Sequence, residues 1–192
     1  MKTQTARMKP PWNFDLCEVN LPDTPPAGWL RLRVQACGIC GTDLSAAAAE
    51  SGDWKPFGHE LAGVVDAVGP EVHNVAPGDQ VALQSSGFCG DCDDCRNGRI
   101  DLCRGEHRNF WGEPAMGFST YMQAPVNHAV PFDGLSADVA SLAEPAGVGF
   151  DMVKTAAIEM GQTVCVVGPG PIALVGVALA VHRGAARVVC VG

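Results

Sequence analysis

The first 140 residues carry short apolar runs separated by turn-forming residues. Leu30 to Ala36 alternates apolar and polar side chains, which predicts a half-buried strand. A valine-rich apolar run follows at residues 61–68, and the turn Pro77-Gly78-Asp79 precedes another short strand at 80–83. Short strands joined by frequent turns are typical of a barrel-like β domain.

The pattern changes near residue 140. Residues 137–155 have helical spacing, 163–167 form a short apolar strand, and 172–183 form a helix that ends at Gly184. A second buried strand is predicted at 187–191. Strand, glycine turn, helix and strand make one βαβ unit of a parallel sheet. A single unit cannot cover both faces of such a sheet, so the pattern indicates an incomplete domain.

Residues 160–181 carry no charged side chain and are numerous enough to cross a bilayer. Their centre, however, is Gly168-Pro169-Gly170-Pro171, which would leave backbone groups unpaired in lipid. A buried strand, turn and helix is therefore the favoured interpretation.

The formal net charge of −8 argues against a nucleic-acid backbone or an anionic membrane as the main partner. The first ten residues are polar and basic and do not resemble a signal peptide. We therefore expect a cytoplasmic protein, in which clustered cysteines bind metal more often than they form disulfides.

Four of the nine cysteines form the run Cys89-x2-Cys92-x2-Cys95-x7-Cys103. Four thiolates on one short loop suit a tetrahedral zinc ion, and because protein fills every position the ion would be structural. Buried or disulfide-bonded cysteines are the plain alternative. An iron–sulfur cluster is a more specific alternative. The bacterial ferredoxin run, however, continues x3-Cys-Pro, whereas here the gap is x7 and Arg104 follows the last cysteine.

A second set of metal-ligating residues precedes this run. Cys40, His59 and Glu60 offer one thiolate, one imidazole and one carboxylate. Catalytic zinc is usually held by three protein ligands and keeps its fourth position open. Taken singly, Cys40 is more often a buried cysteine and His59 a satisfied core histidine, so only their arrangement with other motifs carries weight.

That arrangement resembles the zinc-dependent alcohol dehydrogenase family of medium-chain dehydrogenases, from about residue 31 to 192. The matching motifs, in order, are Cys40-Gly41-Thr42-Asp43, Gly58-His59-Glu60-x2-Gly63-x5-Gly69-x2-Val72, Gly78-Asp79-Gln80-Val81, the cysteine run, and Gly168-Pro169-Gly170-Pro171-Ile172-Ala173-Leu174. The resemblance implies a mixed β and α/β fold. A GroES-like, barrel-type catalytic domain would occupy residues 1–148, and the first βαβ unit of a Rossmann dinucleotide-binding domain residues 149–192.

The resemblance also implies roles for individual residues. Cys40 and His59 would hold the catalytic zinc, and Glu60 would be a ligand or swing in and out of the coordination shell. Asp43 would orient the zinc-bound histidine, and Thr42 would pass the substrate proton outward. Ser45 departs from the family, because many relatives have a histidine there that ends the proton relay. A relay here must be rewired or run through water.

Glu144 falls where the ethanol-type enzymes of the family place a third zinc-binding cysteine. Polyol, threonine and some sugar dehydrogenases have a glutamate at this place, so Glu144 favours that subgroup. The alternative is an ordinary helix-start acid ahead of Pro145. The alanine-rich stretch from Leu44 to Phe57 looks shorter than in relatives, which weakens any inference about substrate.

Gly168-x-Gly170-x-x-Ala173, which also contains Pro171 and Ile172, resembles a dinucleotide-binding fingerprint. Gly168 would permit the tight turn, and Gly170 would let the backbone approach the pyrophosphate at the helix N-terminus. The acidic residue that grips an NAD ribose is expected near the end of the second strand, where this chain has Gly192. NAD and NADP both stay open, with a slight preference for NADP.

These observations predict an oxidoreductase with one catalytic zinc, one structural zinc and NAD or NADP as the hydride acceptor. The substrate would be an alcohol, with polyols or amino alcohols favoured, and the full-length protein is expected to be a homo-oligomer. Two alternatives differ in metal content. A non-catalytic zinc-binding module or inactive dehydrogenase fragment would hold one zinc, and a redox thiol or iron–sulfur protein would hold iron or none.

Overall fold

The computed structural model describes residues 1–104 and 109–192 and divides into two compact units, Met1–Ser141 and Leu142–Gly192. The division falls before the boundary expected after residue 148. Helix α4 (Ala143–Thr155) packs along α5 (Pro171–His182), so its first turn belongs with the second unit.

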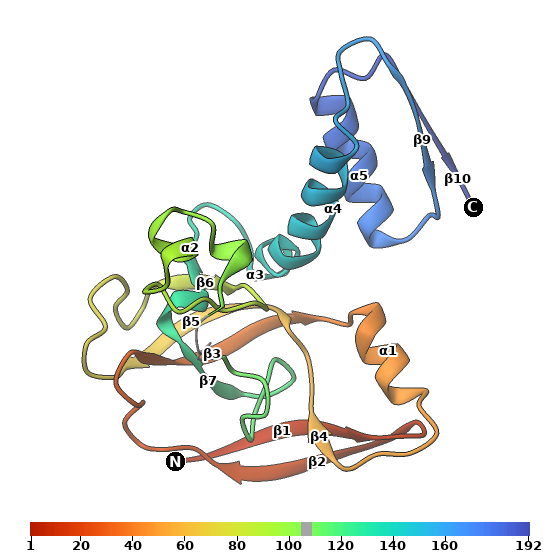
Figure 1. The fold of residues 1–192 in the computed structure, drawn as a ribbon. Coiled ribbons are helices and arrows are strands. Elements are labelled where there is room, and N and C mark those ends of the chain that lie inside the picture. The colour runs from red at the N-terminus through yellow and green to blue at the C-terminus, as the bar shows by residue number, and fades with distance from the viewer. Residues whose placement is uncertain (105–108) are drawn as a thin grey trace. The chain divides into compact units, whose positions relative to one another are not determined.

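Two antiparallel sheets build the first unit (Figure 1). One has the order β2-β1-β4, with β1 at Lys2–Lys9, β2 at Asn13–Asn20 and β4 at Lys55–Pro56. The other has the order β7-β3-β5-β6-β8, with strands at Tyr121–Pro125, Trp29–Gly38, Glu60–Val68, Gln80–Leu83 and Ala129–Pro131. The GroES-like β fold expected from the motifs is thus present.

The larger sheet forms because its strands bury one face each. Leu30 and Leu32 of β3 are fully buried and pack with Leu61 and Val65 of β5 and with the side chain of Phe110. Their period of two is the pattern that predicted these strands. This apolar layer fixes the ends of β3 and β5, where the candidate metal ligands lie.

The hairpin of β1 and β2 is a feature that the hydrophobic pattern does not predict. Its inward positions include Thr3 and Thr5, which are 4% and 2% exposed. The buried face of this hairpin is therefore partly made of polar residues. The hydroxyl of Ser119 donates to that of Thr5 at 2.9 Å, and Lys2 pairs with Glu18 across the two strands. Hydrogen bonding to buried hydroxyls here substitutes for apolar contact.

Short helices occupy the connections of the first unit. Helix α1 (Gly41–Ala47) follows β3, whereas α2 (Asp93–Arg96) and the 3-10 turn η1 (Ile100–Leu102) lie in the cysteine loop after β6. A second 3-10 turn, η2 (Val126–His128), joins β7 to β8, and α3 (Ala137–Ala140) ends the unit. The predicted helical stretch 137–155 is therefore two helices, interrupted at residues 141–142.

The second unit is one βαβ unit. Strands β9 (Thr163–Val167) and β10 (Arg187–Val191) are parallel and in register, with α5 between them. A methyl group at Gly149 would lie 2.7 Å from Val175, so this glycine allows α4 and α5 to approach closely. No described helix is long and apolar enough to span a membrane.

Candidate metal centres

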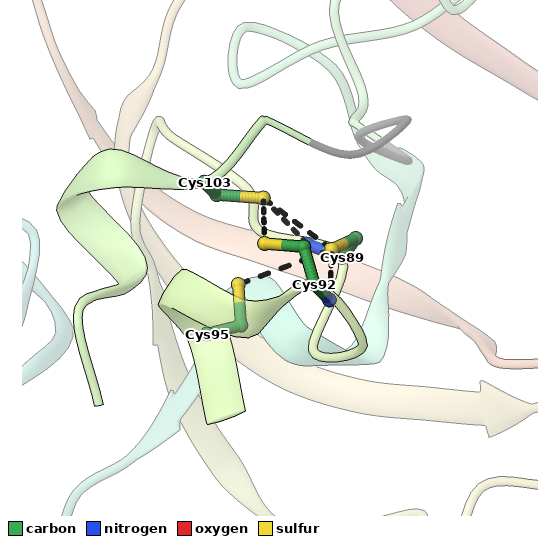
Figure 2. A group of neighbouring side chains, drawn as sticks. All are labelled: Cys89, Cys92, Cys95 and Cys103. Atoms are coloured by element: carbon green, nitrogen blue, oxygen red, sulfur yellow. Dashed lines mark hydrogen bonds between the residues drawn. The ribbon is translucent and has the colours of Figure 1, made fainter. Parts of the chain in front are cut away.

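The four cysteines of the predicted run converge on one point (Figure 2). Sulfur–sulfur distances are 3.9 Å between Cys89 and Cys95, 4.0 Å between Cys92 and Cys103, and 3.5 Å between Cys89 and Cys103. A zinc–sulfur bond of ~2.3 Å in a tetrahedron separates the sulfurs by about 3.8 Å. The spacing of this cluster therefore fits a tetrahedral four-thiolate metal site.

Backbone amides support negative charge on these sulfurs. The Cys89 amide donates to the sulfur of Cys103 at 3.2 Å, and the Cys92 amide donates to that of Cys89 at 3.3 Å. Hydrogen bonds from the backbone of Arg104 and Cys95 lower the pKa of the Cys92 thiol to about 6. Burial instead raises the pKa of Cys95 to about 12, so a bound cation would be needed to ionise all four thiols.

A disulfide is not what gathers these sulfurs. All nine cysteines are free thiols, and a disulfide bond of ~2.05 Å is far shorter than any separation in the cluster. The cluster is also complete, because four protein sulfurs leave no coordination position for a substrate. Its chemistry is that of a structural metal site.

Cys40, His59 and Glu60 form a second cluster, with one ligand atom from each lying within 4.8 Å of the others. Cys40 is the N-cap of α1, and His59 and Glu60 lie at the start of β5. His59 is 5% exposed and Glu60 9% exposed. A thiolate, an imidazole and a carboxylate gathered in this way fit a zinc ion whose fourth coordination position is left for water or substrate.

Asp43 connects two members of this cluster. Its carboxylate oxygen Oδ2 accepts the amide N–H of Cys40 at 3.0 Å, and Oδ1 lies 3.8 Å from Nδ1 of His59. The side chain is only 7% exposed. Asp43 therefore fixes the loop that presents Cys40 while facing the ring of His59, as a supporting carboxylate beside a metal-bound histidine does.

Nδ1 of His59 is a buried polar atom that a metal site would explain. It makes no hydrogen bond to any of the described residues. A metal ion on the other ring nitrogen would place the ring proton on Nδ1, which faces the carboxylate of Asp43 at 3.8 Å. The residues present thus fit the metal that the donor set suggests.

Cys37 lies near this cluster but is not one of its ligands. Burial, with the negative charges of Asp43 and Glu60 nearby, raises the pKa of its thiol to about 12. The distinction between the two cysteines is geometric, because the sulfur of Cys40, and not that of Cys37, groups with the ligand atoms of His59 and Glu60.

Comparison with known proteins decides the family. Residues 26–134 match the model of the alcohol dehydrogenase GroES-like domain. The chain belongs to the alcohol dehydrogenase family. L-galactonate-5-dehydrogenase from Escherichia coli strain K12 is 35% identical over 170 residues, covering 82% of this chain and 47% of that protein. L-threonine 3-dehydrogenase from Pyrococcus abyssi is 34% identical, covering 95% and 54%.

A solved structure of a zinc-binding dehydrogenase from Sinorhizobium meliloti 1021, bound to NADP, aligns with a TM-score of 0.79 and 29% identity. The alignment covers 99% of this chain and 56% of that one. The chain thus spans about half the length of the alcohol dehydrogenase relatives that it matches. Family membership accounts for both the GroES-like β unit and the βαβ unit.

Other residues that the family motif singles out occupy helix starts. Thr42 lies in the first turn of α1 and is exposed, next to the cluster residue Asp43. Ser45 is exposed on the same helix. Glu144 is half-buried in the first turn of α4, ahead of the buried Pro145, in the second unit. Its role as a metal ligand or as a helix-start acid stays a prediction.

The glycine turn of the alcohol dehydrogenase motif connects β9 to α5. Gly168 has a φ of 100°, a left-handed conformation that favours glycine, and its amide donates to Val191 at 2.7 Å. Gly170 is the N-cap of α5, Pro171 and Ile172 open the helix, and Ala173 is buried. The backbone amides at this helix start are free to face an anion in the way that dinucleotide sites use.

Sequence reasoning missed Trp111, the aromatic neighbour of the second cluster. Its ring centroid lies 5.1 Å from that of His59, and its indole N–H donates to the carbonyl of Ser85 at 2.8 Å. Nothing in the local pattern links residue 111 to residue 59. The one available signal was the occurrence of a tryptophan in a polar, glycine-containing loop. A tryptophan there suggests that its indole packs against, or donates a hydrogen bond to, another part of the protein.

Proposed function

We propose that this protein is a zinc-dependent oxidoreductase that interconverts an alcohol and a carbonyl compound with NAD or NADP. The observation that carries the proposal is the pair of separate clusters, one closed with four thiolates and one mixed and open. Structural and catalytic zinc sites differ in this way. Cys89, Cys92, Cys95 and Cys103 would hold the first ion, and Cys40, His59 and Glu60 the second.

The catalytic ion, when bound, would supply Lewis-acid polarisation of the substrate oxygen. The chain's own residues would position the reacting groups. Asp43 would keep Cys40 and His59 in place through the contacts described above. Thr42 would relay the proton of the substrate hydroxyl outward, accepting it while passing its own hydroxyl proton on toward solvent. The substrate carbon would lose a hydride to the nicotinamide ring, so one proton and one hydride leave the alcohol and a carbonyl forms.

The cofactor would bind at the start of α5. Gly168 and Gly170 leave the backbone open, with no side chain to obstruct a pyrophosphate at the helix N-terminus. The solved structure from Sinorhizobium meliloti holds NADP, whereas a solved alcohol dehydrogenase from Escherichia coli CFT073, with a TM-score of 0.80 and 26% identity, holds NADH. NAD and NADP are therefore both candidates for this site.

The substrate would be a polyol, sugar acid or amino alcohol. The relatives at 34–35% identity are named for L-galactonate and L-threonine. By the resemblance described above, Glu144 would match the glutamate of the polyol and threonine subgroup. Glu144 is accordingly a further candidate ligand or positioning residue for the catalytic ion. We also propose a cytoplasmic location, which suits nine free thiols, and a homo-oligomer for the full-length protein.

A second candidate function is a zinc-binding module that no longer performs the chemistry. It is favoured by the four-cysteine cluster, which is complete without a position for a substrate. Such a module would keep the four-cysteine ion and the fold but would not bind a nicotinamide cofactor.

Metal analysis and cofactor binding separate these functions. Two zinc ions per chain, with one lost in Cys40→Ala and the other in Cys103→Ala, would support the oxidoreductase. One ion, insensitive to Cys40→Ala, would support the module instead. Quenching of tryptophan fluorescence by added NADPH, reduced in Gly168→Ala, would test the cofactor site independently of turnover.

A further inference from the structure

Gly38 is the last residue of β3 and faces Glu60 directly across the sheet. Directly opposite residues of an antiparallel pair project their side chains on the same face. A methyl group at position 38 would overlap the carboxylate atom Oε2 of Glu60 and would lie 3.3 Å from its Cβ. The carboxylate of Glu60 thus occupies the space that a side chain at residue 38 would need.

The backbone does not explain why this position is glycine. Gly38 is absent from the residues with positive φ, so its conformation is one that any residue adopts. Glycine within a strand is destabilising relative to alanine, because glycine loses more conformational freedom on folding. The space taken by Glu60 is therefore the reason that the structure provides for a glycine here.

The carboxylate of Glu60 lies beside the other candidate ligands. Glu60 is 9% exposed, and a carboxylate with so little access to solvent is stabilised by a nearby cation. Its ligand atom lies within 4.8 Å of those of Cys40 and His59, which is where such a cation would bind.

We propose that Gly38 is a positioning residue that leaves the space in which the Glu60 carboxylate is held toward Cys40 and His59. This inference rests on the proposed function, which makes Glu60 a ligand of that site, and deepens it by naming what positions the ligand. Real Cβ atoms keep at least 3.0 Å from their neighbours. A methyl group at residue 38 would thus move Oε2 by more than about 0.5 Å, beyond the ~0.2 Å within which metal–ligand distances are held.

The test compares Gly38→Ala, Glu60→Ala and the double variant, with zinc affinity measured by competition with a chelator on the 192-residue chain. We expect Gly38→Ala to weaken the second site by about 10–100-fold, close to Glu60→Ala, and the double variant to lose no more than Glu60→Ala alone. The four-cysteine site serves as an internal reference that should keep its zinc. Gly41→Ala is the matched control, because a methyl group there meets nothing within 4 Å.

Each other outcome overturns the inference. Unchanged zinc affinity in Gly38→Ala would show that Glu60 does not need this space. If the double variant loses zinc affinity by the product of the two single losses, Gly38 acts on a group other than Glu60. If Gly38→Ala fails to fold, Gly38→Ala/Glu60→Asp tests the same clash, since the shorter carboxylate leaves room for the methyl group and should restore folding. A wild-type chain that binds only one zinc would instead defeat the proposed function, and with it the inference.

Discussion

Asp43 provides the most informative single substitution outside the metal ligands themselves. Asp43→Asn keeps the size of the side chain and an oxygen that can accept the Cys40 amide, but it removes the negative charge 3.8 Å from Nδ1 of His59. Loss of such a supporting partner typically lowers metal affinity by about 10–100-fold. At about 1.4 kcal/mol for each factor of ten, this is roughly 1.4–2.8 kcal/mol of binding free energy.

The assay is chelator competition for zinc, with cobalt absorption as a check on the ligand geometry of the second site. Asp79→Asn is the matched control, because Asp79 also accepts a backbone amide three residues away, that of Ala76 at 2.8 Å, and belongs to neither cluster. Wild-type affinity in Asp43→Asn, alongside metal loss in Cys40→Ala, would refute the supporting role of this carboxylate. An equal loss in Asp79→Asn would indicate general loosening instead.

Three further predictions concern the fold and the first metal site, and two of them include a control variant. Cys103→Ser should release the structural zinc and leave the second site loaded, as metal analysis after dialysis would show, whereas loss of both ions would contradict two independent sites. Leu32→Ala should lower the unfolding free energy by about 2–5 kcal/mol in a urea titration, and Leu16→Ala, 79% exposed, by less than ~0.5 kcal/mol. Gly168→Ala, at a φ of 100°, should lower the unfolding free energy by about 1–3 kcal/mol, because alanine is strained in that backbone conformation. Gly147→Ala within α4 should instead raise the unfolding free energy by up to ~1 kcal/mol. Equal effects of the two substitutions would refute the strain argument.

The sequence predicts the parts of this fold in which apolar spacing and structure agree. Strands β3, β5, β6, β9 and β10 and helix α5 were all expected within a few residues of where they lie. The β1–β2 hairpin was missed, because the buried positions of β1 include threonines and its strands are joined by charged cross-strand pairs. The interruption between α3 and α4 was missed as well, since residues 141–142 continue the helical spacing.

The metal clusters could be predicted because their information is local. The spacing of four cysteines within one loop brings them together almost regardless of the surrounding fold, and the structure places all four sulfurs within 4.8 Å of one another. The surroundings of the second cluster could not be predicted in this way. Contacts of Gly38 with Glu60 and of Trp111 with His59 depend on strand register and on a loop far along the chain.

The ring contact between Trp111 and His59 also makes the second metal site visible by spectroscopy. Trp111 is 48% exposed and is tethered by its indole N–H to Ser85, so its fluorescence depends on what lies beside the His59 ring. Cobalt bound at that ring would quench an emitter only 5.1 Å from the ligand side chain. With zinc already held by the four cysteines, cobalt occupancy of the second site could then be followed in real time without a label, even in variants that turn over nothing.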